Sequence, residues 1–279
     1  MSDQQAEQTC QSELEETINA RYDRTMFEAI AVDFYRGSDY INYGYWDSDI
    51  DNGKDAGDRL MEKLLESIPE KHGRILDVAC GKGETSRYLS RYYEPANITG
   101  INISDKQLEH CRSNVPEATF LKMDAVAMEF ADSSFDVVIC VEAAFHFNTR
   151  QRFLQEAFRV LRPSGQLILS DILRTRNVIN YHKRTVAENH LDNSKQYQEL
   201  LERIGFEAVS IRDATKQCWQ SHFREAVRFG HERLLHKKIC LDELKSRLEV
   251  YYQRLQYTQS YLLVAARKPF STKDPLKIC

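Results

Sequence analysis

The stretch RILDVACGKG, residues 74–83, decides the fold of this 279-residue chain. An apolar run that ends in an acid and two closely spaced glycines predicts a strand that turns sharply into a helix. Glycine serves where φ must be positive or where a ligand must approach the main chain without a Cβ in its way. The turn therefore predicts a site in which a small molecule lies against bare backbone.

The residues after the glycines narrow the choice of ligand. A dinucleotide site carries a third glycine for close helix–strand packing, and this chain has Ser86 at that position. A triphosphate site carries Lys and then Ser or Thr after its second glycine. Here Gly83 is followed by Glu84 and Thr85, and a glutamate would repel phosphate. The turn thus disfavours both nicotinamide dinucleotides and nucleoside triphosphates.

Composition and charge point away from nucleic acid, membranes and metal clusters. The net charge is −4 with scattered Lys and Arg residues, so no basic surface for nucleic acid or an anionic membrane is expected. Seven cysteines without a CxxC spacing disfavour a zinc cluster and a disulfide framework. The first twenty residues lack an apolar segment, and no run of 18 apolar residues occurs. We expect a cytoplasmic protein that acts on a small molecule, and a homodimer is the assembly to be considered.

The rhythm of the chain predicts an α/β fold. Short β-rich runs alternate with helical patterns such as 150–161, which indicates βαβ units and a parallel sheet. The expected strands are 74–79, 97–103, 118–122, 135–141, 165–172, 206–212 and 260–267. The last two depart from the alternation and predict an antiparallel pair. The fold class is therefore a seven-stranded, mostly parallel sheet with an antiparallel edge strand.

Segments outside this sheet are expected to enclose the site at the carboxyl ends of the strands. Residues 1–68 predict N-terminal helices and an aromatic loop that together form a lid, with a helix near 57–67. Residues 69–279 predict the main domain. Within it we expect a further lid segment over 173–200 and a helical cap at about 217–256.

Five motifs in order resemble those of class I S-adenosylmethionine-dependent methyltransferases. They are ILDVACGKG (75–83), ITGINIS (98–104), FLKMDA (120–125), FDVVICVEAAFHF (135–147) and RVLRPSGQLILSDI (159–172). The resemblance covers about residues 70–270. It implies a Rossmann-like fold and S-adenosylmethionine as the cofactor. The aromatic segment 42–46 resembles the N-terminal motif of the small-molecule branch of the family.

The resemblance also implies which residues hold the methionine end of the cofactor. Asp77, Ala79, Gly81 and Gly83 belong to the turn whose backbone and acid meet the amino group. Tyr43 lies in the aromatic segment, where a ring can close over the sulfonium cation. From the residues alone, Asp77 can also be a helix-capping acid, and the aromatic rings can be core residues.

The other end of the cofactor is implied to meet the next strands. Asn102, with Ile103, stands where the family usually has an acid that accepts from the ribose hydroxyls, and an amide can still bond both. Asp124 and Ala125 match the position that reads the adenine amino group, although an Asx turn is the alternative for Asp124. Glu142, at the end of strand 135–141, is expected to line the same site.

Two further residues are candidates for catalysis. His146 follows Glu142 by four residues, and Asp171 ends the next strand. The pair resembles the His and Asp of sugar and polyketide O-methyltransferases, in which His would be the base and Asp would orient it. His146 can also be a core or capping residue, and Asp171 can also contact a substrate hydroxyl directly.

The chemistry of methyl transfer explains why a base matters. An amine or thiolate can attack a methyl sulfonium unaided, whereas an alcohol needs a base to take its proton, an effect of about 10² to 10⁴-fold. We therefore expect methyl transfer to a hydroxyl of a small natural-product-type molecule: a polyketide, peptide or sugar moiety. Transfer to carbon or nitrogen of a small molecule is the alternative, and an NAD(P)-dependent oxidoreductase is a more remote one.

No metal is expected in this site. His182 and His190, with Asp192 nearby, are eight residues apart. That separation does not place the two histidines on one helical face, as a metal pair at i, i+4 would be.

Overall fold

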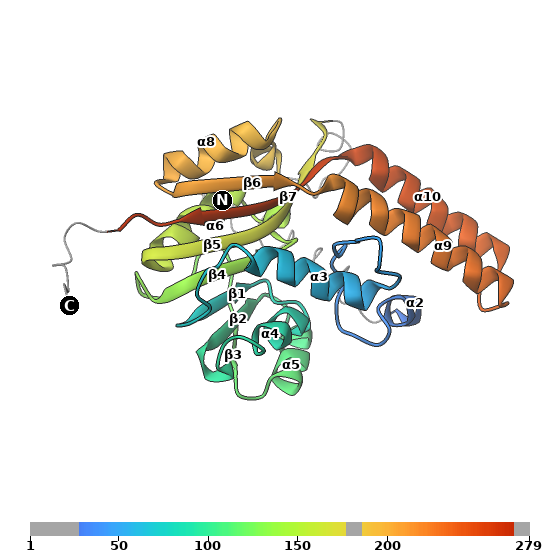
Figure 1. Ribbon diagram of the computed structural model, residues 1–279, viewed down its shortest axis with the longest axis horizontal. Helices are drawn as coiled ribbons and strands as arrows, with labels where there is room; N and C mark the ends of the chain where they lie inside the picture. Colours follow the sequence, from blue (N-terminus) through green and yellow to red (C-terminus); the bar gives the residue numbers. More distant parts are fainter. Residues whose placement is uncertain (1–27, 177–185, 271–279) are drawn as a thin grey trace, which may run out of the picture.

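The computed structural model describes residues 28–176 and 186–270. Its centre is a seven-stranded sheet in the order β3-β2-β1-β4-β5-β7-β6 (Figure 1). The strands are β1 (Ile75–Val78), β2 (Ile98–Asn102), β3 (Thr119–Lys122), β4 (Phe135–Val141), β5 (Leu161–Arg174), β6 (Glu207–Asp213) and β7 (Thr258–Arg267). The β1–β2, β1–β4, β2–β3 and β4–β5 pairs are parallel, and β7 pairs antiparallel with both β5 and β6. The order reverses between β1 and β4, which places a ligand crevice at their carboxyl ends.

Helices cover both faces of the sheet because the central strands are apolar on both sides. Leu76 and Val78 pack in a cluster with residues of α6 (Arg150–Val160) and α8 (Ser194–Ile204). Ile75, one position out of phase, packs in a second cluster with residues of α3 (Gly53–Leu65) and α4 (Glu84–Leu89). Successive side chains of a strand point to opposite faces, so one short strand anchors both helical layers.

The remaining elements connect these layers. They are α5 (Asp105–Asn114), the 3₁₀ turns η1 (Pro95–Asn97), η2 (Ala144–His146) and η3 (Ala187–Asn189), and the π-helical segment η4 (Thr215–Gln220). The turn η2 directly follows β4, and η3 lies just before α8. Both therefore lie at the carboxyl edge of the parallel strands, where the site is expected.

A helical hairpin projects from this same edge. It consists of α9 (Ser221–Leu235) and α10 (Leu241–Tyr257), which run away from the sheet beside α2 (Ala29–Phe34) (Figure 1). The hairpin is tied to α2 by an ion pair between Arg233 and Asp33. The rings of Phe34 and Phe229 meet edge to face between α2 and α9, with centroids 5.4 Å apart.

The sequence-based prediction of the fold is confirmed, with two details changed. The antiparallel strand β7 is second from the edge, between β5 and β6. The helix expected near 57–67 begins earlier, at Gly53, because the side chain of Asn52 accepts a hydrogen bond from the Asp55 amide and caps the first turn. Most of the expected N-terminal helices and part of the expected lid segment lie outside the described residues.

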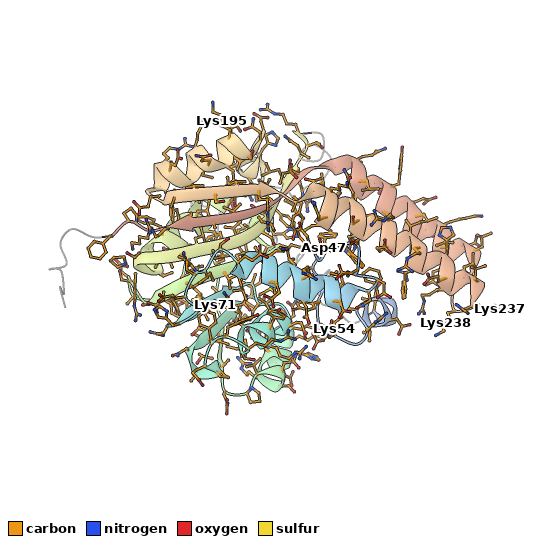
Figure 2. All side chains as sticks on the ribbon, viewed as in Figure 1. Asp47, Lys54, Lys71, Lys195, Lys237 and Lys238 are labelled. Atoms are coloured by element: carbon orange, nitrogen blue, oxygen red, sulfur yellow. The ribbon has the colours of Figure 1, made fainter. Side chains whose placement is uncertain are left out.

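Charged side chains are distributed over the surface rather than massed on one face. Lys71, Lys195 and Lys237 lie on separate parts of the molecule (Figure 2). Among the residues that the structure describes, no helix combines the length and apolar composition needed to cross a bilayer.

Candidate active site

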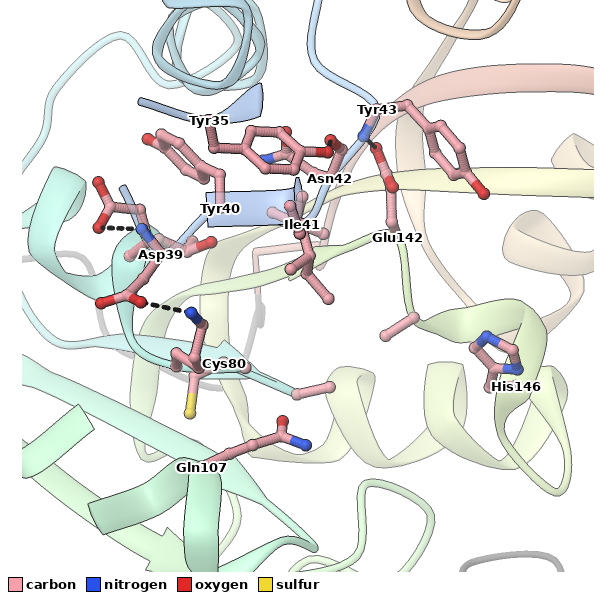
Figure 3. Close-up of a pocket in the computed structure, with 18 of the residues that line it drawn as sticks. Tyr35, Asp39, Tyr40, Ile41, Asn42, Tyr43, Cys80, Gln107, Glu142 and His146 are labelled. Carbon is pink, nitrogen blue, oxygen red and sulfur yellow. Dashed lines mark hydrogen bonds and ion pairs between the residues drawn. The ribbon is translucent and has the colours of Figure 1, made fainter. Parts of the chain in front are cut away.

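A cavity of about 690 Å³ opens at the carboxyl ends of β1, β2 and β4. Its floor is formed by the turn after β1 and the ends of the neighbouring strands. Its far walls come from α2, residues 39–43 and the α9–α10 hairpin. Figure 3 shows residues 39–43 on the opposite side of the cavity from Cys80 and Gln107. Small-molecule sites usually measure about 300 to 1,000 Å³, so this cavity has room for a cofactor and a second small molecule.

The turn after β1 brings backbone to the floor of the cavity. Ala79 and Gly81 line it, with φ angles of 59° and 56°. Gly83, with φ of 89°, lies behind the floor and begins α4. A Cβ on Gly83 would lie 2.9 Å from the Cα of Cys111, so the glycine allows α4 and α5 to approach closely. The floor is therefore main chain, as the glycine pattern predicts.

Asp77 lies just beneath this turn rather than in the cavity wall. Its carboxylate is buried and accepts a hydrogen bond of 2.7 Å from Ser86 Oγ. Burial raises the pKa of Asp77 to about 7, although the Ser86 hydroxyl partly opposes the shift. Ser86 thus replaces the third glycine of a dinucleotide site and instead holds the acid of the turn.

Asn102 lines the cavity and connects two of its loops. Its side-chain oxygen accepts from the amides of Ile103, at 2.7 Å, and Ser104. Its Nδ2 donates to Gln107 Oε1, at 2.9 Å, and to the carbonyl oxygen of Gly81, at 3.3 Å. A carboxylate could not make the last two bonds. The amide that the sequence has in place of the usual acid therefore also ties the β2 end to the glycine turn.

Asp124 and Ala125 line the cavity next to the end of β3. Asp124 Oδ1 accepts a hydrogen bond of 3.1 Å from the amide of Val126. This is an Asx turn, the alternative that the sequence allows for Asp124. Asp124 therefore forms an Asx turn and also lines the cavity wall.

Glu142 and Tyr43 join the two sides of the cavity. Glu142 Oε1 accepts from the Tyr43 amide at 2.7 Å (Figure 3). It also accepts from the Tyr261 hydroxyl at 2.6 Å. Burial raises the pKa of Glu142 to about 8, despite these two hydrogen bonds. The φ of Glu142 is 55°, a strained region for a side chain of this size. The acid therefore fixes the aromatic segment over the ends of β4 and β7.

His146 lines the cavity beyond Glu142, on the turn η2 (Figure 3). The main chain of this turn is held from behind by Asn189, whose Nδ2 donates to the carbonyl oxygen of Phe147 at 2.7 Å. Asn189 Oδ1 in turn accepts from the Arg150 amide at 2.6 Å. The ring of His146 lies 4.2 Å from the ring of Phe145, between centroids. The segment that carries His146 is thus anchored to η3 and to the start of α6.

Asp171 does not line the cavity, which corrects the expectation that it shares the pocket with His146. The carboxylate is fully buried and forms an ion pair with Arg150 Nε at 2.7 Å. It also accepts a hydrogen bond of 2.9 Å from the Tyr197 hydroxyl. The physical reason is that Arg150, itself buried at the start of α6, needs charge compensation, and the ion pair with Asp171 supplies it.

Two residues of the α9–α10 hairpin that the sequence reasoning treated only as part of a cap also line the cavity. They are His222 and Arg254. His222 Nδ1 donates to the carbonyl oxygen of Tyr43 at 3.1 Å. Burial, assisted by the positive charge of Arg254, lowers the pKa of His222 to about 3. The helical spacing of 217–256 predicted an apolar cap, but nothing local in the sequence marks these two positions.

The candidate metal residues are only partly described. His182 lies outside the described residues. His190 Nε2 lies 3.0 Å from Asp192 Oδ1, and Arg176 also contacts both side chains.

Comparisons with known proteins agree with this geometry. Residues 76–169 match the methyltransferase domain family model. The 27-O-demethylrifamycin SV methyltransferase of Amycolatopsis mediterranei is 30% identical over 250 residues, which cover 82% of this chain and 90% of that protein. Methyltransferase GfsG of Streptomyces halstedii is 32% identical over 200 residues, 64% of this chain and 70% of that one. In fold, the crystal structure of the [4+2]-cyclase SpnF superposes with a TM-score of 0.68 at 22% identity, covering 91% and 96% of the two chains.

The cavity also fits S-adenosylmethionine on structural grounds. The floor is backbone at a glycine turn, the buried acid Asp77 has no cation within its reach among the described residues, and an amide and an acid follow at the next two strands. An ammonium group, ribose hydroxyls and an adenine amino group are the partners that such residues accept. The chain belongs to the class I S-adenosylmethionine-dependent methyltransferases, in the branch that acts on small molecules.

Proposed function

We propose that the protein transfers a methyl group to a hydroxyl oxygen of a small natural-product-type molecule, such as a polyketide, peptide or sugar moiety, with His146 as the base. S-adenosylmethionine, when bound, supplies the methyl group on a sulfonium centre. The observation that carries the proposal is the place of His146 in the cavity wall, one turn beyond the strand end at Glu142. The name of the 30%-identical relative, a methyltransferase of 27-O-demethylrifamycin SV, supports oxygen as the acceptor atom.

The proposed roles of the other residues follow from their positions. Asp77 would accept from the amino group of the cofactor, while Ala79, Gly81 and Gly83 form the turn on which its methionine part lies. Asn102 and Ile103 would meet the ribose, and Asp124 and Ala125 the adenine. All of these residues except Asp77 and Gly83 line the cavity, and those two lie directly behind its floor.

The segments from α2, 42–46 and α9–α10 would exclude water from the reacting atoms. Tyr43 packs against Trp219 and His222, with ring centroids 4.5 Å and 4.8 Å apart, and Glu142 holds the Tyr43 backbone. A dry site keeps the oxygen nucleophile from being solvated. Correct alignment of nucleophile and methyl carbon contributes up to about 7 to 11 kcal/mol, which is why a fixed aromatic wall matters.

Asp171 would act as a positioning residue rather than as a partner of the imidazole. Its ion pair with Arg150 fixes the start of α6, and Arg150 and Asn189 hold the main chain on which His146 stands. The role expected from the family resemblance is thus proposed to operate through two intermediate residues.

The test is methyl transfer to matched pairs of compounds. Purified protein with S-adenosylmethionine is given hydroxylated polyketides, peptides and glycosides, each beside its deoxy analogue, and methylated products are detected by mass spectrometry. We expect product from the hydroxyl member only, and His146→Ala should lower kcat by about 10² to 10⁴-fold while S-adenosylhomocysteine affinity stays within about twofold. His72→Ala, at an exposed position, is the control.

Two results would reject parts of the proposal. Methylation of the deoxy members would place the methyl group on carbon or nitrogen, the alternative that shares this cofactor site. A His146→Ala variant that methylates at the normal rate would remove His146 as the base, even if oxygen is the acceptor.

A further inference from the structure

One face of α10 forms a continuous wall of the cavity. The residues of this face are Glu243, Ser246, Arg247, Val250, Tyr251 and Arg254. Their spacing of three and four residues places them on one stripe of the helix. The stripe runs from the hairpin tip towards β7, so Arg254, near the helix end, lies closest to the sheet.

Arg254 differs from the other cations that line the cavity in forming no ion pair with any residue that the structure describes. Three Lys or Arg side chains of the described chain line the cavity. Lys82 pairs with Asp39 at 2.5 Å, and Arg247 pairs with Glu243 at 3.0 Å. Arg254 forms no ion pair or hydrogen bond with any residue in the ranges 28–176 and 186–270. Its guanidinium therefore lines the cavity, and none of its five N–H donors is bonded to a residue in these ranges.

Arg254 acts electrostatically on two neutral groups of the cavity, Tyr35 and His222. The Tyr35 hydroxyl donates to the carbonyl oxygen of Asn42 at 2.6 Å. Glu142 also acts on Tyr35, and burial raises the pKa of Glu142 to about 8, so that it is mainly protonated at pH 7. Glu28 and Glu243 line the cavity as well, and neither forms an ion pair with Arg254. A cation that lines a partly buried cavity and has no anionic partner among the described residues is a binding element for an anion.

Apolar side chains line the half of the cavity that is formed by α2, α9 and α10. Phe34, Phe229 and Val250 are contributed by these three helices in turn, and the rings of Tyr251 and Phe223 pack with centroids 5.4 Å apart and an interplanar angle of 56°. Apolar walls with a few polar groups are typical of small-molecule sites.

We propose that Arg254 binds a carboxylate of the acceptor molecule, whose apolar part lies against Phe34, Phe229 and Val250. The proposal rests on the proposed function in one respect, namely that this half of the cavity receives the acceptor. It adds that the acceptor is an acid, and that the acid group selects the orientation in which its other groups face the cofactor. His222 contributes a fixed neutral imidazole beside this anchor, because its Nδ1–H is held by the Tyr43 carbonyl.

The test uses binding alone. The fluorescent dye N-phenyl-1-naphthylamine is bound to protein saturated with S-adenosylhomocysteine, and is displaced by decanoate or by decanamide, which share the chain and differ in charge. We expect decanoate to displace the dye at a concentration at least about tenfold lower than decanamide, since a charge-assisted hydrogen bond contributes about 1.5 to 3 kcal/mol. Arg254→Gln should abolish this difference, and Arg254→Lys should retain part of it.

Lys245→Gln is the matched control, because it removes a cation from the same helix at a residue that does not line the cavity. It should leave both displacements unchanged. Calorimetry with S-adenosylhomocysteine should give the same affinity for Arg254→Gln as for the wild type.

Three outcomes overturn the proposal. Equal displacement by the two probes in the wild type would mean that no acid site exists. If Arg254→Gln weakened dye displacement by decanoate and by decanamide equally, Arg254 would contribute to the shape of the cavity wall and not to recognition of an acid. A fall in S-adenosylhomocysteine affinity would assign Arg254 to the carboxylate of the cofactor. None of these measurements involves methyl transfer, so they are independent of whether His146 is the base.

Discussion

Arg150 lies between Asp171 and Asn189, so that an ion pair inside the core is connected to the segment that bears His146. Its Nε contacts Asp171 at 2.7 Å, and its Nη1 donates to the carbonyl oxygen of Asn189. The two charged side chains are 3% and 0% exposed. The position of the candidate base His146 thus depends on a charged pair that lies outside the cavity.

Removal of one member of this pair should be costly. We expect Asp171→Asn to lower the free energy of unfolding by about 3 to 5 kcal/mol, because it leaves the Arg150 charge buried and uncompensated. The double variant Arg150→Met/Asp171→Leu should recover most of this loss, as measured by urea unfolding. Its kcat should remain low while its S-adenosylhomocysteine affinity is normal. A normal kcat in the double variant would contradict the positioning role.

A surface pair provides the reference for this measurement. Arg267 and Glu207 are 50% and 44% exposed and lie 2.8 Å apart. Arg267→Gln should change the free energy of unfolding by less than about 1 kcal/mol.

Cofactor binding should depend on pH through Asp77. The carboxyl has a pKa of about 7 in the protein without ligand, and a cofactor ammonium group would favour its ionised form. The fraction ready to bind therefore falls below pH 7, and the Kd for S-adenosylhomocysteine should be roughly tenfold higher at pH 6 than at pH 8. Calorimetry at the two pH values measures this. Equal Kd values would show that Asp77 does not meet the ammonium group.

The raised pKa of Asp77 has the opposite effect on stability, which should decrease rather than increase as the pH rises. Because burial raises the folded pKa of Asp77 above its unfolded value, the folded protein holds the proton more tightly. The stabilisation is complete below about pH 4 and is lost as the pH rises through about 7. Asp77→Asn should therefore have a higher Tm than the wild type at pH 8 without cofactor, together with weak, pH-independent binding of S-adenosylhomocysteine.

Conversion of Asn102 to the acid usual in the family should weaken the site. Asn102→Asp removes two donated hydrogen bonds and places a carboxylate 3.3 Å from the Gly81 carbonyl oxygen. We expect a loss of about 1 to 3 kcal/mol in the free energy of unfolding and no gain in S-adenosylhomocysteine affinity. Asn193→Asp, which preserves the N-cap of α8, should be nearly neutral. A tighter complex for Asn102→Asp would mean that the ribose contact outweighs the loop contacts.

Gly83 and Gly37 allow the effect of close packing to be separated from that of backbone conformation. Both have positive φ, 89° and 77°. A Cβ on Gly83 meets the Cα of Cys111 at 2.9 Å, whereas a Cβ on Gly37 meets no atom within 4 Å. Gly37→Ala should cost about 1 kcal/mol, and Gly83→Ala should cost at least 1 kcal/mol more, since α5 must move. Equal changes in Tm would show that the α4–α5 contact is loose.

The strands and the cofactor turn were predictable because their signals are local. Each apolar strand and each helical pattern can be recognised from a few consecutive residues. The turn after Ile75–Val78 needs positive φ angles, which glycine adopts most easily. The helix start at Gly53 has a weaker signal. This signal is the single cap residue Asn52, which lies inside a stretch rich in turn-forming residues.

The sequence by itself determined the order of strands and helices, the bare backbone of the turn after β1 and the family to which the chain belongs, since each rests on neighbouring residues. Only the tertiary structure decided which distant residues lie together around the candidate active site. Tyr43 and His222, 179 residues apart, share a hydrogen bond, Asp171 turns away to Arg150, and Arg254 reaches the cavity without a partner among the described residues. The physical reason is that burial and charge compensation depend on which distant segments pack together, and no local pattern encodes that choice.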